Sequence, residues 1–305
     1  MKNLVVLLGP TAVGKTDLAL QLAEHLGCPI INADSRQLYK DLKIGTAAPT
    51  GQQLQQVQHY FVGTLDIEDY YSAARFEDEA ISLIDKLFRS HDTLLLSGGS
   101  MLYIDAVCKG IDDIPTIHEE TRTTLRQRLA DEGLDALAQE LRLLDPEYYA
   151  TVDLKNTKRI VHALEVCYQT GRTFTSFRTA TAKQRPFNIL KIGLNRPRHE
   201  LFERINNRVD KMIDDGLLQE ARALLPYRHA NSLNTVGYKE MFQVIDGTWT
   251  IDIARERMKK NTRVYAKKQL TWFAHDAGIQ WFHPDEREAI IAYIDVNLQK
   301  PQNDL

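Results

Sequence analysis

The chain has 305 residues, of which 43% are hydrophobic and 26% are charged, and its formal net charge is −3. This length is typical of about two domains, and the composition is ordinary for a globular enzyme. No apolar run approaches the ~20 residues of a membrane-spanning helix, and the N-terminus leads into a strand without a signal peptide. The three cysteines lie far apart and indicate neither a zinc site nor disulfide bonds. We therefore expect a cytoplasmic protein with no membrane partner.

The first motif joins a predicted strand at residues 4–8 to a predicted helix at residues 18–26. Between them stands a G-x-x-x-x-G-K-[ST] phosphate loop, which consists of Gly9, Pro10, Thr11, Ala12, Val13, Gly14, Lys15 and Thr16. The loop amides and the helix N-terminus attract an anion, and Lys15 adds a full charge. The Thr16 hydroxyl can bind Mg²⁺. By itself this motif indicates nucleotide binding, above all of ATP.

The elements that follow alternate between strand and helix, which is the pattern of a doubly wound parallel sheet. Strands are predicted at residues 29–33, 60–62 and 93–97, and helices at 101–108 and at 73–89, where Ser72 is the N-cap. Residues 116–180 show only helical patterns, at 119–131, 134–144, 146–150 and 157–169. A strand at 187–194, helical residues 198–225, a turn at 234–238, a helix at 251–274 and a strand at 279–282 complete the chain, with a frayed tail at 301–305.

We therefore predict an α/β fold, a P-loop-type doubly wound parallel sheet core with an all-helical insertion domain. The core comprises residues 1–115 and 186–305, and the insertion comprises residues 116–185. Residues 1–115 contain 9 Lys and Arg and 15 Asp and Glu, whereas residues 186–272 contain 16 Lys and Arg and 10 Asp and Glu. This asymmetry favours a polyanionic partner, although solvated charged helices would produce the same counts.

Asp34 directly follows the second predicted strand, at the edge where doubly wound proteins bind their ligands. A carboxylate opposite the phosphate loop can act as a general base or bind Mg²⁺ through water. The segment also matches a helix start, with Asp34 as N-cap and Gln37 in capping-box spacing. The two roles are compatible, because a capping carboxylate keeps a second oxygen.

Residues 97–100 read Ser-Gly-Gly-Ser and end the buried strand without the acid that P-loop NTPases usually place there. This favours a site that holds a diphosphate over one that hydrolyses ATP. In the predicted helix at 251–274, Lys259, Arg263 and Lys267 recur every four residues on one side. The excess of bases there favours contact with nucleic-acid phosphates, and a solvated face is the alternative.

Together these motifs resemble the tRNA dimethylallyltransferase (isopentenyltransferase) family. The matching segments are residues 9–16, 34–39, 45–47, 71–73, 98–103, 158–166, 236–240 and 262–272. They span nearly the whole chain. The loop alone is common to many kinases, but the ordered set is specific to this family.

The resemblance implies transfer of a dimethylallyl group from dimethylallyl diphosphate to N6 of the adenosine on the 3′ side of a tRNA anticodon. Asp34 would accept the proton, while Lys15 and Thr16, with Mg²⁺ bound between Thr16 and diphosphate oxygens, would stabilise the leaving group. The insertion and the basic helix would grip the anticodon stem-loop. The implied tRNA contacts are Asp34, Ser35, Arg36, Gln37, Ser100, Arg122, Lys158, Arg159, Arg263 and Lys267. We expect a monomer.

Three other functions are compatible with parts of the chain. A small-molecule or nucleotide kinase would use the same loop with ATP, but it needs an arginine-rich lid and residues 116–185 are nearly neutral. An adenylate prenyltransferase acting on free nucleotide would need neither the insertion nor the basic helix. A non-catalytic RNA-binding module would need neither Asp34 nor an intact phosphate loop.

Overall fold

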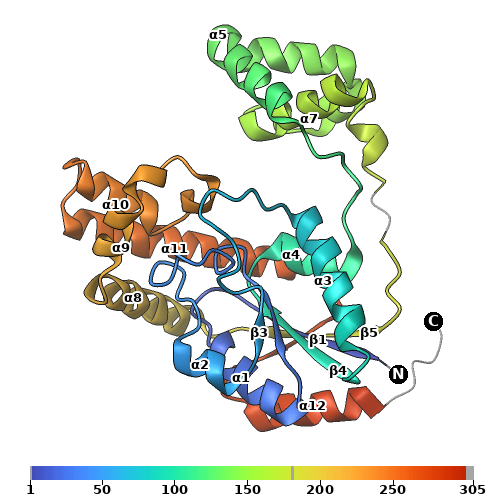
Figure 1. Ribbon diagram of the computed structural model, residues 1–305, viewed down its shortest axis with the longest axis vertical. Coiled ribbons are helices and arrows are strands. Elements are labelled where there is room, and N and C mark those ends of the chain that lie inside the picture. The colour runs from blue at the N-terminus through green and yellow to red at the C-terminus, as the bar shows by residue number, and fades with distance from the viewer. Residues whose placement is uncertain (1, 180–181, 300–305) are drawn as a thin grey trace. The chain divides into compact units, whose positions relative to one another are not determined.

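The computed structural model describes residues 2–179 and 182–299 (Figure 1). The chain forms two compact units. Residues Met1–Lys109 and Gln184–Leu305 make up one, which we call the core unit, and Gly110–Lys183 make up the other, which we call the helical unit.

The core unit is built on a six-stranded parallel sheet of order β3-β2-β4-β1-β5-β6. Its strands are β1 (Asn3–Leu8), β2 (Ile30–Ala33), β3 (His59–Tyr60), β4 (Thr93–Gly98), β5 (Asn188–Leu194) and β6 (Ile279–Phe282). All six residues of β1 are buried, because β4 and β5 flank it and helices cover both faces. Continuous burial explains its uninterrupted apolar sequence. The predicted α/β fold class is confirmed.

Helices cover both faces of this sheet (Figure 1). On one face lie α1 (Lys15–Leu26) and α12 (Arg287–Gln299), which are joined by a 3.0 Å contact between His25 Nε2 and Asp295 Oδ1. On the other lie α3 (Ala73–Leu87), α4 (Met101–Lys109) and α11 (Ile251–Phe273). The remaining helices of the core unit are α2 (Gly51–Gln56), α8 (Arg198–Asp214), α9 (Leu217–Ala223) and α10 (Tyr238–Ile245). Short 3₁₀ turns, η2 (Leu225–Tyr227) and η3 (Asn231–Leu233), complete the unit.

Two local predictions had opposite outcomes. Ser72 caps α3 as predicted, since its hydroxyl accepts a 3.1 Å hydrogen bond from the backbone N–H of Arg75. The helix start predicted at Asp34 is wrong, because residues 35–38 form turns. Asp34 Oδ1 instead accepts from the N–H of Arg36 at 2.9 Å, two residues on, which closes a tight turn.

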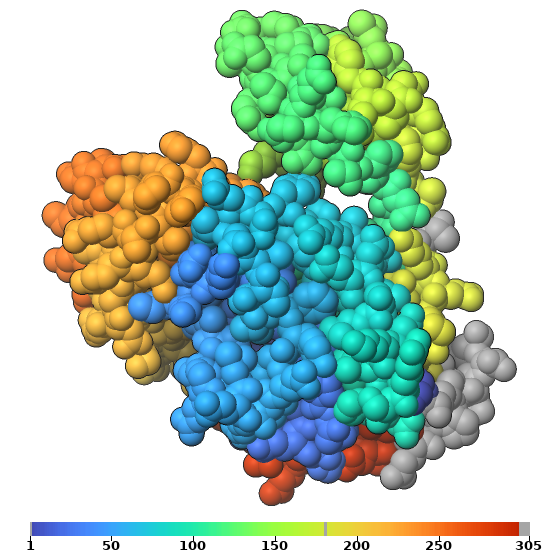
Figure 2. All heavy atoms as spheres, viewed as in Figure 1, coloured from blue at the N-terminus to red at the C-terminus, as the bar shows by residue number. Residues whose placement is uncertain are grey.

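Segments that are distant in sequence meet at the surface of the core unit. The first hundred residues (blue to cyan) and residues 200–250 (yellow to orange) border each other in Figure 2. The Glu220 carboxylate of α9 joins them, because it accepts the backbone N–H groups of Ile44 and Gly45 at 2.8 and 2.9 Å. The same carboxylate accepts the Tyr238 hydroxyl at 2.6 Å.

The helical unit has a core of its own. It contains α5 (Glu119–Leu144), α6 (Pro146–Thr151), α7 (Thr157–Thr170) and the turn η1 (Thr175–Phe177). Gly133, with φ 82°, interrupts α5 where the sequence predicts a break between two helices. The fully buried side chains include Leu137, Leu141, Ile160 and Leu164.

The helical unit begins earlier than residue 116. Ile114 packs against its apolar core, and Asp112 Oδ1 accepts the Thr179 N–H at 3.0 Å. These contacts explain why residues 110–115 group with the helices.

No helix within residues 2–179 and 182–299 is long and apolar enough to cross a membrane. The tail at 301–305 lies outside the described residues.

Candidate active site

The phosphate loop leaves the central strand β1 and closes around Lys15. The Lys15 ammonium donates hydrogen bonds to the carbonyl oxygens of Gly9 and Pro10, at 2.9 and 2.7 Å. Gly9 has φ 154°, and a Cβ there would lie 2.7 Å from the Leu194 carbonyl oxygen, so the β1–β5 contact requires glycine. Gly14, with φ 112°, precedes the first residue of α1. The loop therefore lies at a helix N-terminus, as the motif predicts.

Asp34 reaches the same edge of the sheet from β2. Strands β2 and β4 approach so closely at their carboxyl ends that a Cβ on Gly98 would lie 2.2 Å from the Ala33 carbonyl oxygen. The Ser100 hydroxyl beyond β4 accepts the Ser35 N–H at 2.8 Å and thereby fixes the turn that carries Asp34. Small residues after β4 thus bring Asp34 and the phosphate loop to one site.

One cavity of about 830 Å³, within the core unit, contains these groups. Lys15, Thr16 and Asp34 line it, together with Arg208 of α8 and Tyr265 of α11. A volume of this size is typical of a small-molecule site. Sequence-distant residues of α1, α8 and α11 therefore surround a single reaction space.

Burial shifts the pKa values of the two cations in this cavity. Burial lowers the pKa of Lys15 to about 7, Asp34 acts to raise it, and Arg208 lowers it further. Burial also lowers the pKa of Arg208 below its usual value, against the effect of Asp34. Two partly buried cations face one carboxylate, so a bound polyanion would offset the cost of their desolvation. The cavity is suited to a diphosphate.

The predicted residues near the loop fall into two groups. Thr11, Ala12, Gly14, Lys15, Thr16, Asp34, Ser35, Arg36 and Gln37 line the cavity, whereas Gly9, Pro10, Val13 and Ser100 are buried and do not line it. Arg36 Nη1 is anchored on the carbonyl oxygens of Asn231 and Ser232, at 2.9 and 3.2 Å. Gln37 Nε2 donates to the Thr46 and Ala47 carbonyl oxygens at 3.1 Å.

The predicted basic side of α11 faces another part of the core unit. Arg263 and Lys267 line a second cavity, of about 800 Å³, between α8, α11 and the loop after β6. Arg263 Nη1 donates to Asn206 Oδ1 of α8 at 2.6 Å. Lys259 contacts the Asp210 carboxylate at 2.9 Å. Much of this side of α11 therefore packs against α8, and the face with Thr262 and Tyr265 lines the first cavity.

The remaining predicted residues lie on the helical unit. Arg122 belongs to α5, and Lys158 and Arg159 are exposed in the first turn of α7. Neither Lys158 nor Arg159 forms an ion pair within the part of the chain that the structure describes. Both remain available to a polyanion.

Two further residues at this cavity were not singled out from the sequence. Arg208 was only one of many bases in its segment, and its Nη2 donates to the Thr46 carbonyl oxygen at 3.2 Å inside the cavity. Gln269 accepts the Thr11 N–H at 2.9 Å and donates to the Gly99 carbonyl oxygen at 2.8 Å, and so braces the phosphate loop. It lies on the buried stripe of α11 with Ala266 and Phe273, so helical periodicity could have found it.

The donor atoms of the cavity fit Mg²⁺ better than a softer metal. No group of three His, Cys, Asp or Glu side chains within the described residues is placed to hold a metal alone. The Thr16 hydroxyl and the Asp34 carboxylate are oxygen donors beside the phosphate loop. Mg²⁺ prefers few protein ligands together with phosphate oxygens and water.

Comparisons with known proteins point to one family. The family model described as IPP transferase matches residues 37–276. The chain is 62% identical over 292 residues to tRNA dimethylallyltransferase 1 of Phocaeicola vulgatus, which covers 96% of this chain and 97% of that protein. It is 58% identical over 298 residues to tRNA dimethylallyltransferase 1 of Bacteroides fragilis, covering 98% and 99% of the two chains.

Solved structures give the same result. The full-length tRNA isopentenylpyrophosphate transferase from Bacillus halodurans has a TM-score of 0.72 and 34% identity, covering 98% of this chain and 97% of that one. A eukaryotic dimethylallyltransferase acting on tRNA has a TM-score of 0.82 and 25% identity, covering 100% and 81%. Kinase activity is accordingly not favoured, and the chain belongs to the IPP transferase family of tRNA dimethylallyltransferases.

Proposed function

We propose that this prenyltransferase moves the dimethylallyl group of dimethylallyl diphosphate to N6 of the adenosine on the 3′ side of a tRNA anticodon. The observation that carries the proposal is the single cavity shared by Asp34, Lys15 and the phosphate loop. It holds an anion-binding cradle and a carboxylate within one reaction space. The names of the close relatives support tRNA as the acceptor.

In this reaction N6 attacks C1 of the dimethylallyl group as the bond from C1 to the diphosphate oxygen breaks. The electron pair leaves with the diphosphate, and the N6 proton passes to Asp34. The exocyclic amine is a weak nucleophile, so removal of its proton by a nearby carboxylate assists the step. The target adenine has to leave the stack of neighbouring bases before its N6 can reach the cavity.

The chain supplies the charge that a departing diphosphate needs. Lys15, Arg208 and the loop amides would stabilise the developing anion. The Thr16 hydroxyl would help to hold Mg²⁺, which would neutralise part of that charge. We expect the protein to be a monomer, and we expect the exposed Lys158 and Arg159 to contribute to binding the anticodon stem-loop. Ultracentrifugation with and without tRNA would measure both the oligomeric state and the binding.

The direct experiment combines the protein with labelled dimethylallyl diphosphate and unmodified tRNA. We expect label in tRNA at the adenosine beside the anticodon, and none in free AMP. Labelling of AMP, or phosphate transfer from ATP without prenyl transfer, would sink the proposal.

Asp34→Asn tests the general base. This change keeps the shape of the side chain but removes its basicity, so kcat is expected to fall about 10²–10⁴-fold. The affinity for tRNA should stay within a few-fold of the unaltered chain. If Asp34 only orders its turn, the variant would lose thermal stability without a selective loss of rate.

A further inference from the structure

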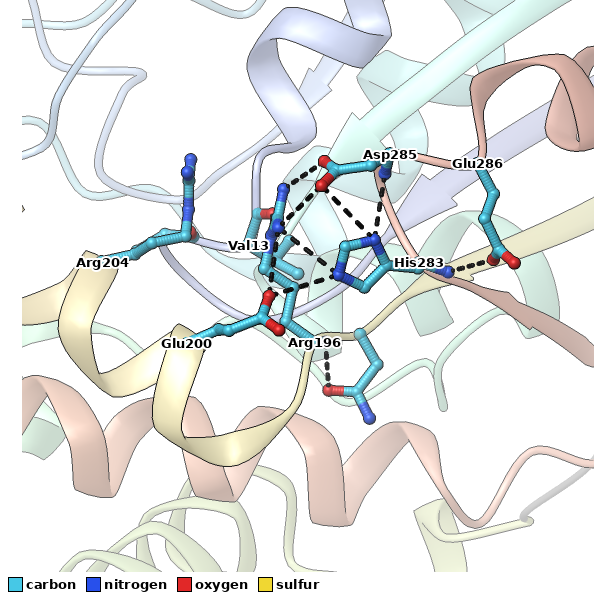
Figure 3. Close-up of polar contacts among 9 residues, drawn as sticks. Val13, Arg196, Glu200, Arg204, His283, Asp285 and Glu286 are labelled. Carbon is cyan, nitrogen blue, oxygen red and sulfur yellow. Dashed lines mark hydrogen bonds and ion pairs between the residues drawn. The ribbon is translucent and has the colours of Figure 1, made fainter.

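Two arginines from the segment after β5 hydrogen-bond carbonyl oxygens of the phosphate loop: Arg196, which lines the second cavity, and Arg204, which lines the first. Arg196 Nε donates to the Val13 carbonyl oxygen at 3.0 Å, and Arg204 Nε donates to the Ala12 carbonyl oxygen at 2.9 Å (Figure 3). Neither contact is required by the phosphate-loop motif, because both arginines come from the segment that follows β5. They hold two consecutive peptide groups of the loop.

The orientation of these peptide groups decides how the loop binds. In a trans peptide the carbonyl and the following N–H point in opposite directions. A guanidinium on the Val13 carbonyl therefore turns the N–H of Gly14 toward the opposite side. The backbone here is costly to hold without support, since Ala12 has φ 63°, which a residue with a side chain rarely adopts.

Arg196 is itself fixed from three directions (Figure 3). Its Nη2 and Nη1 donate to the two carboxylate oxygens of Asp285, at 2.6 and 3.3 Å. Nη1 also lies 3.4 Å from Glu200 Oε2 and 3.4 Å from His283 Nε2. The side chain is only 10% exposed. The hydrogen bond from Arg196 holds the pKa of Asp285 below its usual value, as expected for a tight ion pair.

The charge of Arg196 does not explain its position. Asp285 and Glu200 pair with it directly and offset its charge, so little of that charge acts on a ligand. What remains is the fixed direction of its Nε–H bond to the loop. A planar guanidinium can bind a carboxylate through one edge and a carbonyl through Nε, which an ammonium cannot do.

We propose that Arg196, held by Asp285, is a positioning residue that sets the phosphate loop in its diphosphate-binding conformation. The inference rests on the proposed function, because it assumes that the loop holds a diphosphate. Arg196 acts through the Val13–Gly14 peptide group and does not touch the substrate. The loop's affinity for diphosphate thus depends on residues near the C-terminus that the phosphate-loop motif does not contain.

The experiment measures the binding of inorganic diphosphate with Mg²⁺ by calorimetry in Arg196→Met and Arg196→Lys. For Arg196→Met we expect the Kd to rise about tenfold, the value that corresponds to loss of one charge-assisted hydrogen bond. Arg196→Lys should recover only part of this. The KM for dimethylallyl diphosphate should rise in parallel, with tRNA affinity unchanged.

Asp285→Asn separates positioning from electrostatics. It removes a negative charge near the loop, so a purely electrostatic effect would tighten diphosphate binding, whereas loss of the bidentate pair should weaken it. The matched control is the Arg228–Asp246 pair, which has similar bidentate geometry at 3.0 and 2.6 Å and lines neither of the two cavities described above. Arg228→Met and Asp246→Asn should leave the diphosphate Kd unchanged.

The outcomes are distinct. Tighter binding in Asp285→Asn, or a diphosphate Kd within twofold of the unaltered chain in a folded Arg196→Met variant, would overturn the inference. A lowered melting temperature with unchanged diphosphate affinity would assign Arg196 a merely structural role and would also overturn it. Failure of the unaltered chain to bind diphosphate would contradict the proposed function itself.

Discussion

At the scale of single residues, Lys15 is the group whose state depends most on the ligand. Burial sets its pKa at about 7 in the free protein. A diphosphate beside the ammonium favours the charged form, so above pH 7 binding has to be accompanied by proton uptake. We predict that the affinity for inorganic diphosphate falls as pH rises from 7 to 9, approaching about tenfold per pH unit.

Calorimetry at several pH values, in buffers of different ionisation enthalpy, would measure both the affinity and the uptake of protons. Lys15→Arg provides the control, because a guanidinium remains charged throughout this range. The protonation state of the diphosphate also changes with pH, but this changes the affinity of Lys15→Arg and of the unaltered chain equally. The same pH slope in the variant and the unaltered chain would contradict the assignment of the proton to Lys15.

At the scale of elements, a buried ion pair ties the re-entry into β5 to the helices on one face of the sheet. Arg185 Nη2 donates to Glu77 Oε1 of α3 at 2.7 Å and to the Ala106 carbonyl oxygen of α4 at 2.6 Å. Its Nε donates to the Val107 carbonyl oxygen at 2.8 Å. The two side chains are only 9% and 5% exposed. The chain thus returns from the helical unit to a point fixed by α3 and α4.

We predict that Arg185→Met lowers the free energy of unfolding of the core unit by about 3–5 kcal/mol, because it removes the guanidinium that pairs with the buried Glu77 carboxylate. Tryptophan fluorescence during urea unfolding measures this unit alone, since Trp249, Trp272 and Trp281 all belong to it. Arg89→Met, at an exposed position after α3, should change it by less than about 0.5 kcal/mol. A loss below about 1 kcal/mol for Arg185→Met would show that the pair is dispensable.

At the scale of the whole molecule, the two units have separate apolar cores. The two connections also lie side by side, because a Cβ on Gly110 would fall 2.6 Å from the Lys183 side chain. Residues 111–182 can therefore be replaced by a short Gly-Ser linker. We predict that the shortened protein binds diphosphate within a few-fold of the full chain, since every residue around the first cavity remains.

The same protein should bind tRNA at least about tenfold more weakly, because the exposed cations of the helical unit are gone. Filter binding with unmodified tRNA at fixed ionic strength measures this loss. If the shortened protein kept its full affinity for tRNA, the core unit alone would bind the tRNA. Loss of diphosphate binding would mean that the first cavity depends on the helical unit.

Local signals predicted the parts of this protein that depend on near neighbours in sequence. The phosphate loop follows from eight consecutive residues, and the Ser72 cap from a side chain beside its own helix. The parallel sheet follows from apolar runs separated by helical periods. The helix start at Asp34 was wrong because an aspartate can close a turn as readily as it caps a helix, and only its surroundings decide which.

The sequence by itself thus determined the fold class, the phosphate-loop motif at the end of β1 and the family to which the chain belongs. Only the tertiary structure decided which bases serve the site. Arg208 lines the first cavity, whereas Arg196, Arg263 and Lys267 line the second, from which Arg196 also reaches the Val13 carbonyl oxygen of the phosphate loop. All four are cations on or beside two basic helices, and composition cannot distinguish them. The direction of each side chain depends on how α8 and α11 pack on the sheet, which is a property of contacts far apart in sequence.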